Sequence, residues 1–338
     1  MGVSAIAAFR INDRSNVAEV RRAAGARARA LGWSPTACGE TEIVATEVAT
    51  NLVKHARDGV VALANSPNGT QGARLLVVAI DRGPGIADLA RSFVDGFSTS
   101  GSPGTGLGAI RRLSYQTDVL SAPDGTVMMA ELRDRSAPTA GDNEPRPLRV
   151  AGFGVPKEGE LVSGDAWAHR WLGQRLAIIV CDGLGHGYEA SKAAERAIEC
   201  FESDGWETPK QALELANEHL RSTRGAAAAV VLVDAANRRV RFCGVGNIVA
   251  GIVADDHARH LVSHNGILGM APRIGEFEYD WPKGATLMMH SDGLSSRWQL
   301  PRWSGIWRRH PALIAGIAYR DLARGTDDTV VVVAGEHG

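Results

Sequence analysis

The chain has 338 residues, of which 44% are hydrophobic and 22% charged, and 37 basic side chains nearly balance 38 acidic ones. This length is typical of two domains, and the near-zero net charge argues against nucleic acid or a membrane surface as the main partner. No apolar run approaches the roughly 18 residues that cross a bilayer, and residues 1–10 lack a signal-peptide pattern, so we expect a cytoplasmic protein. The four cysteines have no metal-type spacing and are expected to be free thiols.

Hydrophobic periodicity and breaking residues predict the helices and strands. Ser15 is the expected N-cap of the first helix. Helices are expected over residues 17–31, 35–56, 109–113, 188–201, 209–221 and 309–324. Strands are expected over residues 59–64, 73–80, 118–121, 126–132, 176–181, 226–233, 239–243, 248–253, 286–291 and 329–333. Because most strands follow one another in hairpins, we expect an α+β protein with antiparallel sheets and helices packed outside them.

Residues 133–147 are charged, contain proline and almost lack large apolar side chains. Such a composition is typical of a linker between domains. We therefore expect an N-terminal domain over residues 1–134, a linker over residues 135–146 and a C-terminal domain over residues 147–338.

In the C-terminal half, Asp182 directly follows the apolar run 176–181, and Gly183, Gly185 and Gly187 come within the next five positions. The run predicts a buried strand that brings the carboxylate to a sheet edge, where the glycines allow the backbone positive φ angles. Oxygen ligands on a tight loop suit a hard divalent cation such as Mg²⁺ or Mn²⁺. A strand followed by Asp-Gly is more often a plain turn, so one such acid is weak evidence.

Further acids occur in the same setting. Asp165 follows a short strand-like segment at residues 161–164, Asp292 follows the strand 286–291, and Asp327 and Asp328 precede the last strand. Acids at strand ends can converge on one edge of a sheet, where a pair of metal ions is a common solution for phosphoryl chemistry.

Five segments of the C-terminal half together resemble a known family, the metal-dependent PPM-type serine/threonine phosphatases in their bacterial SpoIIE/RsbX branch. They are residues 163–165, 180–187, 244–247, 291–293 and 327–328. The resemblance implies an α-β-β-α sandwich that binds two Mn²⁺ or Mg²⁺ ions and hydrolyses phosphoserine or phosphothreonine with metal-activated water. It implies Asp182 and Asp292 as catalytic residues. The metal ligands that it implies are Asp165, Asp182, the carbonyl of Gly183, Asp292, Asp327 and Asp328.

The last ligand position is ambiguous. The family usually has one residue between its acidic pair and a threonine, whereas here Thr329 directly follows Asp328. Either Asp327 or Asp328 fits, and Asp327 is favoured because Asp328 is nearer the strand. A second open choice concerns His186, which either positions the substrate phosphate or makes a structural hydrogen bond.

Three motifs stand in the N-terminal half. Glu47 and Asn51 share one face of the second helix because they are four residues apart. Asp81 precedes two glycines, and a Gly-Thr-Gly-Leu-Gly loop at residues 104–108 opens a helix. Each motif alone is weak, because solvated helix faces, turns and Gly-rich loops are common.

In this order the motifs resemble the N, G1 and G2 boxes of the GHKL ATPases, whose Bergerat fold is an α/β sandwich, and most closely the RsbT-type anti-sigma-factor kinases. The resemblance implies ATP and Mg²⁺ as cofactors and Glu47 as the catalytic base that accepts a proton from an incoming hydroxyl. Asn51 would ligate Mg²⁺. The nucleotide-binding residues that it implies are Asn51, Asp81, Gly83, Gly85, Gly104, Thr105, Gly106, Leu107 and Gly108.

The two resemblances together imply a bifunctional switch protein, a serine kinase fused to the phosphatase that reverses its action. The expected substrate is a small STAS-domain antagonist in a partner-switching or stressosome pathway. The alternative is a phosphatase gated by a non-catalytic ATP sensor or anti-sigma binding domain. The intact Glu47 favours phosphoryl transfer, because a sensor needs no base.

Overall fold

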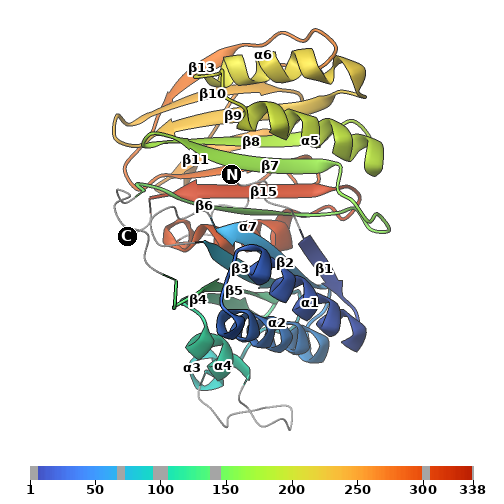
Figure 1. Ribbon diagram of the computed structural model, residues 1–338. Coiled ribbons are helices and arrows are strands. Elements are labelled where there is room, and N and C mark those ends of the chain that lie inside the picture. The colour runs from blue at the N-terminus through green and yellow to red at the C-terminus, as the bar shows by residue number, and fades with distance from the viewer. Residues whose placement is uncertain (1–6, 67–72, 94–105, 138–145, 299–304, 337–338) are drawn as a thin grey trace. The chain divides into compact units, whose positions relative to one another are not determined.

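The computed structural model describes residues 7–66, 73–93, 106–137, 146–298 and 305–336 (Figure 1). The chain divides near residue 146 into two compact units, and each is described by itself. None of the helices in these ranges combines the length and the hydropathy that crossing a membrane needs. All four cysteines are buried and free, as expected.

The N-terminal unit is a five-stranded antiparallel sheet in the order β1-β2-β3-β5-β4. Its strands are β1 (Ala7–Ile11), β2 (Gly59–Ser66), β3 (Arg74–Ile80), β4 (Gln116–Ala122) and β5 (Gly125–Arg133). Its helices are α1 (Arg14–Ala30), α2 (Pro35–His55), α3 (Leu89–Ser92) and α4 (Gly106–Leu113). Val44, Val48 and Leu52 recur every four residues along α2 and pack with Val61 and Val77 of the sheet, so the apolar stripe of this helix fixes it on the sheet.

The prediction that Ser15 caps the first helix was wrong, because the N-cap is Asp13. The Asp13 carboxylate accepts a 2.7 Å hydrogen bond from the Ser15 backbone N–H, and Asn16 Oδ1 accepts one from the Asp13 backbone N–H. A charged acceptor two residues earlier in the chain therefore starts the helix before Ser15.

A buried ion pair joins strands β3 and β5. Arg74 Nη1 lies 2.9 Å from Glu131 Oε2, and neither side chain is more than 5% exposed. We expect Glu131→Ala to lower the free energy of unfolding of this unit by about 3–5 kcal/mol, because it removes the carboxylate that balances a buried guanidinium. Amide hydrogen exchange in β3 and β5 measures the loss. Glu42→Ala breaks a more exposed pair with Arg29 and is expected to cost less than about 1 kcal/mol, so equal effects of the two substitutions would contradict the prediction.

The C-terminal unit contains two five-stranded antiparallel sheets, in the orders β13-β10-β9-β8-β7 and β12-β11-β14-β15-β6. The first sheet consists of β7 (Asp165–Leu172), β8 (Arg175–Gly183), β9 (Ala226–Asp234), β10 (Arg239–Val245) and β13 (Glu276–Asp280). The second consists of β6 (Arg149–Val155), β11 (Val249–Ala254), β12 (His257–His260), β14 (Thr286–His290) and β15 (Thr329–Gly335). The helices are α5 (Tyr188–Glu202), α6 (Pro209–His219) and α7 (Pro311–Leu322). The α+β prediction is confirmed for both units.

Strand β8 shows how alternating side chains build two layers. Ile178 and Val180 belong to the core between the two sheets, whereas Ile179 and Cys181 belong to the core beneath α5 and α6. Figure 1 shows these two helices on the sheet that contains β8. Successive side chains of a strand point to opposite faces, so one apolar run serves both cores. Cys181 is thus a packing residue one position before the acid.

The antiparallel pairing brings the aspartates to one edge. Asp165 begins β7 and lies opposite Asp182 near the end of β8. Asp292 follows β14, and Asp327 precedes β15, which pairs with β14. The prediction of a strand over residues 161–164 was wrong, because the strand begins at Asp165 itself. The acid still reaches the common edge, because in an antiparallel pair the start of one strand lies beside the end of its neighbour.

Candidate functional site

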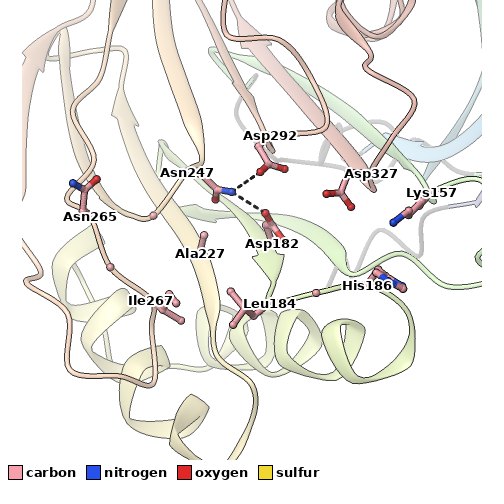
Figure 2. Close-up of a pocket in the computed structure, with 13 residues that line it drawn as sticks. Lys157, Asp182, Leu184, His186, Ala227, Asn247, Asn265, Ile267, Asp292 and Asp327 are labelled. Atoms are coloured by element: carbon pink, nitrogen blue, oxygen red, sulfur yellow. Dashed lines mark hydrogen bonds between the residues drawn. The ribbon is translucent and has the colours of Figure 1, made fainter.

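A pocket of about 480 Å³ opens at this edge of the C-terminal unit. Asp182, Asp292 and Asp327 line it, and Figure 2 shows their side chains directed toward one another. Lys157, which is positively charged, and His186, which can be protonated, also line the pocket. Three carboxylates converging on a polar pocket make a site for a cation and a phosphate rather than for an apolar ligand.

Asn247 holds two of these acids. Its Nδ2 donates hydrogen bonds to Asp292 Oδ2 at 2.8 Å and to Asp182 Oδ2 at 3.2 Å (Figure 2). Asn247 ends the Gly-Val-Gly-Asn segment at residues 244–247, for which no role was predicted. Lys157 was missed as well, because a lone lysine in a loop carries no sequence signal.

Two further aspartates lie buried behind the pocket. Asp165 is 5% exposed, and its Oδ2 has no hydrogen-bond partner in the described part of the chain. Asp328 is 3% exposed, and both its oxygens accept 2.8 Å hydrogen bonds from backbone N–H groups, of Lys157 and Gly164. Asp327 lines the pocket, whereas Asp328 is buried and both its oxygens accept backbone hydrogen bonds, so Asp327 remains the predicted ligand of the two.

Burial and mutual repulsion raise the pKa of two of these aspartates. Burial, followed by the charge of Asp292, raises the pKa of Asp182 to about 7. Burial and the charge of Asp182 raise the pKa of Asp165 well above its usual range. Carboxylates packed this closely are destabilised as anions unless a cation balances them.

The donor set therefore fits divalent cations, with Asp165 supplying an unsatisfied buried oxygen. In the described residues no three acidic, histidine or cysteine side chains already surround one point closely enough to hold an ion.

We expect Asp182→Asn to raise the melting temperature of the EDTA-treated protein, and to raise it more at pH 8 than at pH 5. The raised pKa means that the folded protein binds more protons than the unfolded chain between about pH 4 and pH 7, so stability is lost as pH rises through this window. Burial lowers the pKa of His169 and His290 to about 4, which adds stability toward neutral pH in both proteins, so the difference between them isolates Asp182. Scanning calorimetry in EDTA at both pH values checks this, and a difference that shrinks with pH would contradict it.

The glycines of the site serve different purposes. Gly185 and Gly187 have φ angles of +97° and +73°, as predicted for the turn after β8. The same prediction for Gly183 was wrong, because Gly183 is still part of the strand. A Cβ on Gly183 would overlap the Ala190 carbonyl, so the glycine allows α5 to approach β8 closely. That the Gly183 carbonyl binds a metal ion stays a prediction.

His186 makes the structural contact that was one of its two alternatives. Its Nδ1 lies 2.7 Å from Glu160 Oε1, while the ring also lines the pocket. A carboxylate partner fixes the orientation of an imidazole that faces the substrate position.

In the N-terminal unit, the structure brings the predicted base, metal ligand and Gly-rich loop together. A Cβ on Gly106 would lie 2.7 Å from Glu47 Oε2 and 3.7 Å from Asn51 Oδ1. Asn51 Nδ2 is buried and has no partner among the residues that the structure describes. Leu107 and Gly108 continue the first turn of α4, whereas Gly104 and Thr105 lie outside the described residues. The start of α4 and the face of α2 thus form one polar site that fits a phosphate and its cation.

Asp81, one of the predicted nucleotide-binding residues, lies in a tight turn after β3. Asp81 Oδ1 accepts a 2.6 Å hydrogen bond from the Gly83 backbone N–H. A Cβ on Gly83 would lie 2.8 Å from the His55 carbonyl at the end of α2. Gly85 has a φ of +75°, and a Cβ there would overlap the Ala122 carbonyl. Both glycines are therefore required where the turn packs against its neighbours.

Each half of the chain matches a known protein family. The family "Histidine kinase-like ATPase domain" matches residues 11–131, and the family "Stage II sporulation protein E (SpoIIE)" matches residues 173–334. The chain is 33% identical to serine/threonine-protein kinase RsbT of Bacillus subtilis (strain 168) over 105 residues, which are 30% of this chain and 77% of RsbT. It is 24% identical to phosphoserine phosphatase RsbX of the same strain over 145 residues, which are 42% of this chain and 73% of RsbX.

A similar solved structure is described as "The bacterial stressosome: a modular system that has been adapted to control secondary messenger signaling". It has a TM-score of 0.52 and 30% sequence identity, and the match covers 55% of this chain and 98% of that chain. Together with the two family matches, these relatives account for both units of the fold. The chain therefore belongs to the histidine kinase-like ATPase family through its N-terminal part and to the SpoIIE family of PPM-type serine/threonine phosphatases through its C-terminal part.

Proposed function

We propose that this chain is a bifunctional partner-switching regulator that phosphorylates and dephosphorylates a STAS-domain antagonist protein. A kinase domain over residues 1–134 and a phosphatase domain over residues 147–338 are joined by the linker 135–146. The observation that carries the proposal is that Asp182, Asp292 and Asp327 line one pocket, while Glu47 and Asn51 lie against the start of α4 in the other unit. Similarity to both RsbT and RsbX on one chain, and to a stressosome structure, supports opposing activities on a common substrate.

In the phosphatase half, Asp165, Asp182, Asp292 and Asp327 would hold two Mg²⁺ or Mn²⁺ ions. When bound, such ions supply an activated water and neutralise the charge of the phosphate. Lys157 lines the same pocket and places a positive charge where a phosphate dianion enters. Asn247 holds Asp182 and Asp292 at a fixed separation before the ions and substrate arrive.

In the kinase half, Asp81 would accept a hydrogen bond from the exocyclic amine of adenine, and Asn51 would offer an oxygen to the Mg²⁺ of ATP. Glu47 lies one helical turn from Asn51 and against the start of α4, so its carboxylate is placed to take the proton of a serine hydroxyl. The backbone N–H groups at the start of α4 favour the negative phosphates.

The test uses a purified STAS-domain protein from the same organism, incubated with [γ-³²P]ATP, Mg²⁺ and Mn²⁺. The Asp182→Asn chain is expected to accumulate the labelled protein, because its kinase domain is intact. Wild-type chain added afterwards is expected to release the label as inorganic phosphate. Label that never enters the STAS protein would refute the kinase half, and label that wild-type chain does not remove would refute the phosphatase half.

A further inference from the structure

Exposed apolar residues occur close in the chain to residues of the phosphatase pocket. Among the described residues eight large apolar side chains are strongly exposed, and five of them lie in three loops or, in the case of Tyr188, at the start of α5, near pocket residues in the chain. We name these five the apolar rim: Leu161, Val162, Leu184, Tyr188 and Met270. Leu161 is 97% exposed and Tyr188 65%, so neither contributes to a core.

The rim is continuous with the pocket on one side through Leu184. Leu184 and Ile267 both line the pocket (Figure 2). The Leu184 backbone N–H donates a 3.0 Å hydrogen bond to the Gly225 carbonyl, and Ile267 Cγ2 lies 2.7 Å from the position of a Cβ on Gly225, so the two loops meet there. Met270 closes the turn from Ile267 with a 3.2 Å backbone hydrogen bond.

The rim continues on the other side through Glu160. Its carboxylate lies 2.7 Å from the pocket residue His186 and also 3.2 Å from the position of a Cβ on Gly187. Leu161 follows Glu160 directly and Tyr188 follows Gly187 directly. Exposed apolar residues therefore directly follow, in the chain, residues that contact the pocket on this side as well, and the pocket itself is lined by three aspartates.

A small phosphate monoester would contact only the polar groups of the pocket. Exposed apolar residues near the pocket would be contacted only by a larger ligand, such as a protein. We propose that the apolar rim binds aliphatic or aromatic side chains that flank the phosphoserine or phosphothreonine of a protein substrate. This inference rests on the proposed phosphatase function and specifies its substrate class, a phosphoprotein whose phosphorylated residue lies in an apolar surface patch. Continuity of the rim with the catalytic pocket identifies the occupant as the molecule whose phosphate enters that pocket.

The test compares the full-length wild type with the triple variant Leu161→Ser, Tyr188→Ser, Met270→Ser. The substrates are p-nitrophenyl phosphate and two synthetic phosphoserine peptides that differ only in the four flanking positions, which are leucine or isoleucine in one and serine or glycine in the other. The wild type is expected to have a kcat/KM about tenfold higher for the apolar peptide, and the triple variant to lose this preference. Turnover of p-nitrophenyl phosphate is expected to stay unchanged, and Val262→Ser, at an exposed apolar residue outside the rim, is the matched control.

Equal kcat/KM of the wild type for the two peptides, or a triple variant that keeps the preference, would overturn the rim as a substrate surface. So would a triple variant that only changes the oligomeric state in sedimentation, because the rim would then join two copies of the chain. Hydrolysis of p-nitrophenyl phosphate without hydrolysis of either peptide would instead refute the phosphoprotein substrate on which the inference rests.

Discussion

Asp182→Asn is expected to lower the Mn²⁺-dependent turnover of p-nitrophenyl phosphate at least about 1000-fold. This side chain accepts a hydrogen bond from Asn247, and the charges of Asp292, Asp327 and Asp328 all act on it. Loss of one charged ligand from a metal-dependent phosphoryl site removes several kcal/mol of transition-state stabilisation, and each 1.4 kcal/mol is tenfold in rate. Asp292→Asn is expected to have a similar effect, because Asn247 holds both acids.

The control is Asp204→Asn, which neutralises a fully exposed aspartate of the same unit that pairs with Arg170. It is expected to leave turnover within about twofold of the wild type. Neutralising Asp182 also relieves crowding among buried carboxylates, so the variant is expected to melt no lower than the metal-free wild type. A variant that keeps more than a tenth of the activity would show that Asp182 does not bind the reactive ions.

The convergence of the acids could be predicted because it depends on local sequence. Asp182 follows a short continuous run of apolar and β-branched residues with glycines after it, which is typical of a buried strand. The pairing that places Asp165 opposite Asp182 was not predicted, because no strand was expected over the residues of β7. Asp165 was expected to follow a strand, whereas it begins one, and it reaches the common edge through antiparallel pairing with β8.

Edge strands could not be predicted in the same way. The residues of β12 are His-Ala-Arg-His and those of β13 are Glu-Phe-Glu-Tyr-Asp, which are largely polar. Their place in a sheet comes from pairing with β11 and β10, and no apolar run marks that pairing in the sequence. The charged side chains are also those expected of edge strands, because they oppose pairing with another molecule.

Asp327 and Asp328 could not be told apart from the sequence for a different reason. Two neighbouring aspartates have the same chemistry, and what separates them is the direction of each side chain. Asp328 accepts hydrogen bonds from the backbone of Lys157 and Gly164, which lie more than 160 residues earlier in the chain. Such long-range partners leave no trace in the local sequence. Asn247 is a similar case, because its role depends on two acids from other strands.

Glu47→Gln is expected to reduce phosphoryl transfer from ATP to the STAS-domain protein by about 100- to 10,000-fold while ATP binding stays within about threefold. The carboxylate is the proposed proton acceptor, and general-base catalysis contributes this range of rate. The amide keeps the size of the side chain against Gly106, so α2 and α4 are expected to stay packed as in the wild type. Measuring ³²P transfer together with ATP affinity by calorimetry separates chemistry from binding, in the Asp182→Asn background so that the phosphatase does not remove the product.

Glu19→Gln, at an exposed glutamate of α1, is the matched control and is expected to change neither quantity. Equal transfer rates for Glu47→Gln and the control would exclude Glu47 as the base. If instead the Asp182→Asn parent binds ATP tightly but transfers no label, the N-terminal unit is a nucleotide sensor, and ATP is then expected to alter the rate at which the wild-type phosphatase half hydrolyses p-nitrophenyl phosphate. If the N-terminal unit is a kinase, labelled STAS protein is expected to form and its formation to depend on Glu47. If the unit is a sensor, the phosphatase activity is expected to depend on ATP and not on the Glu47 carboxylate.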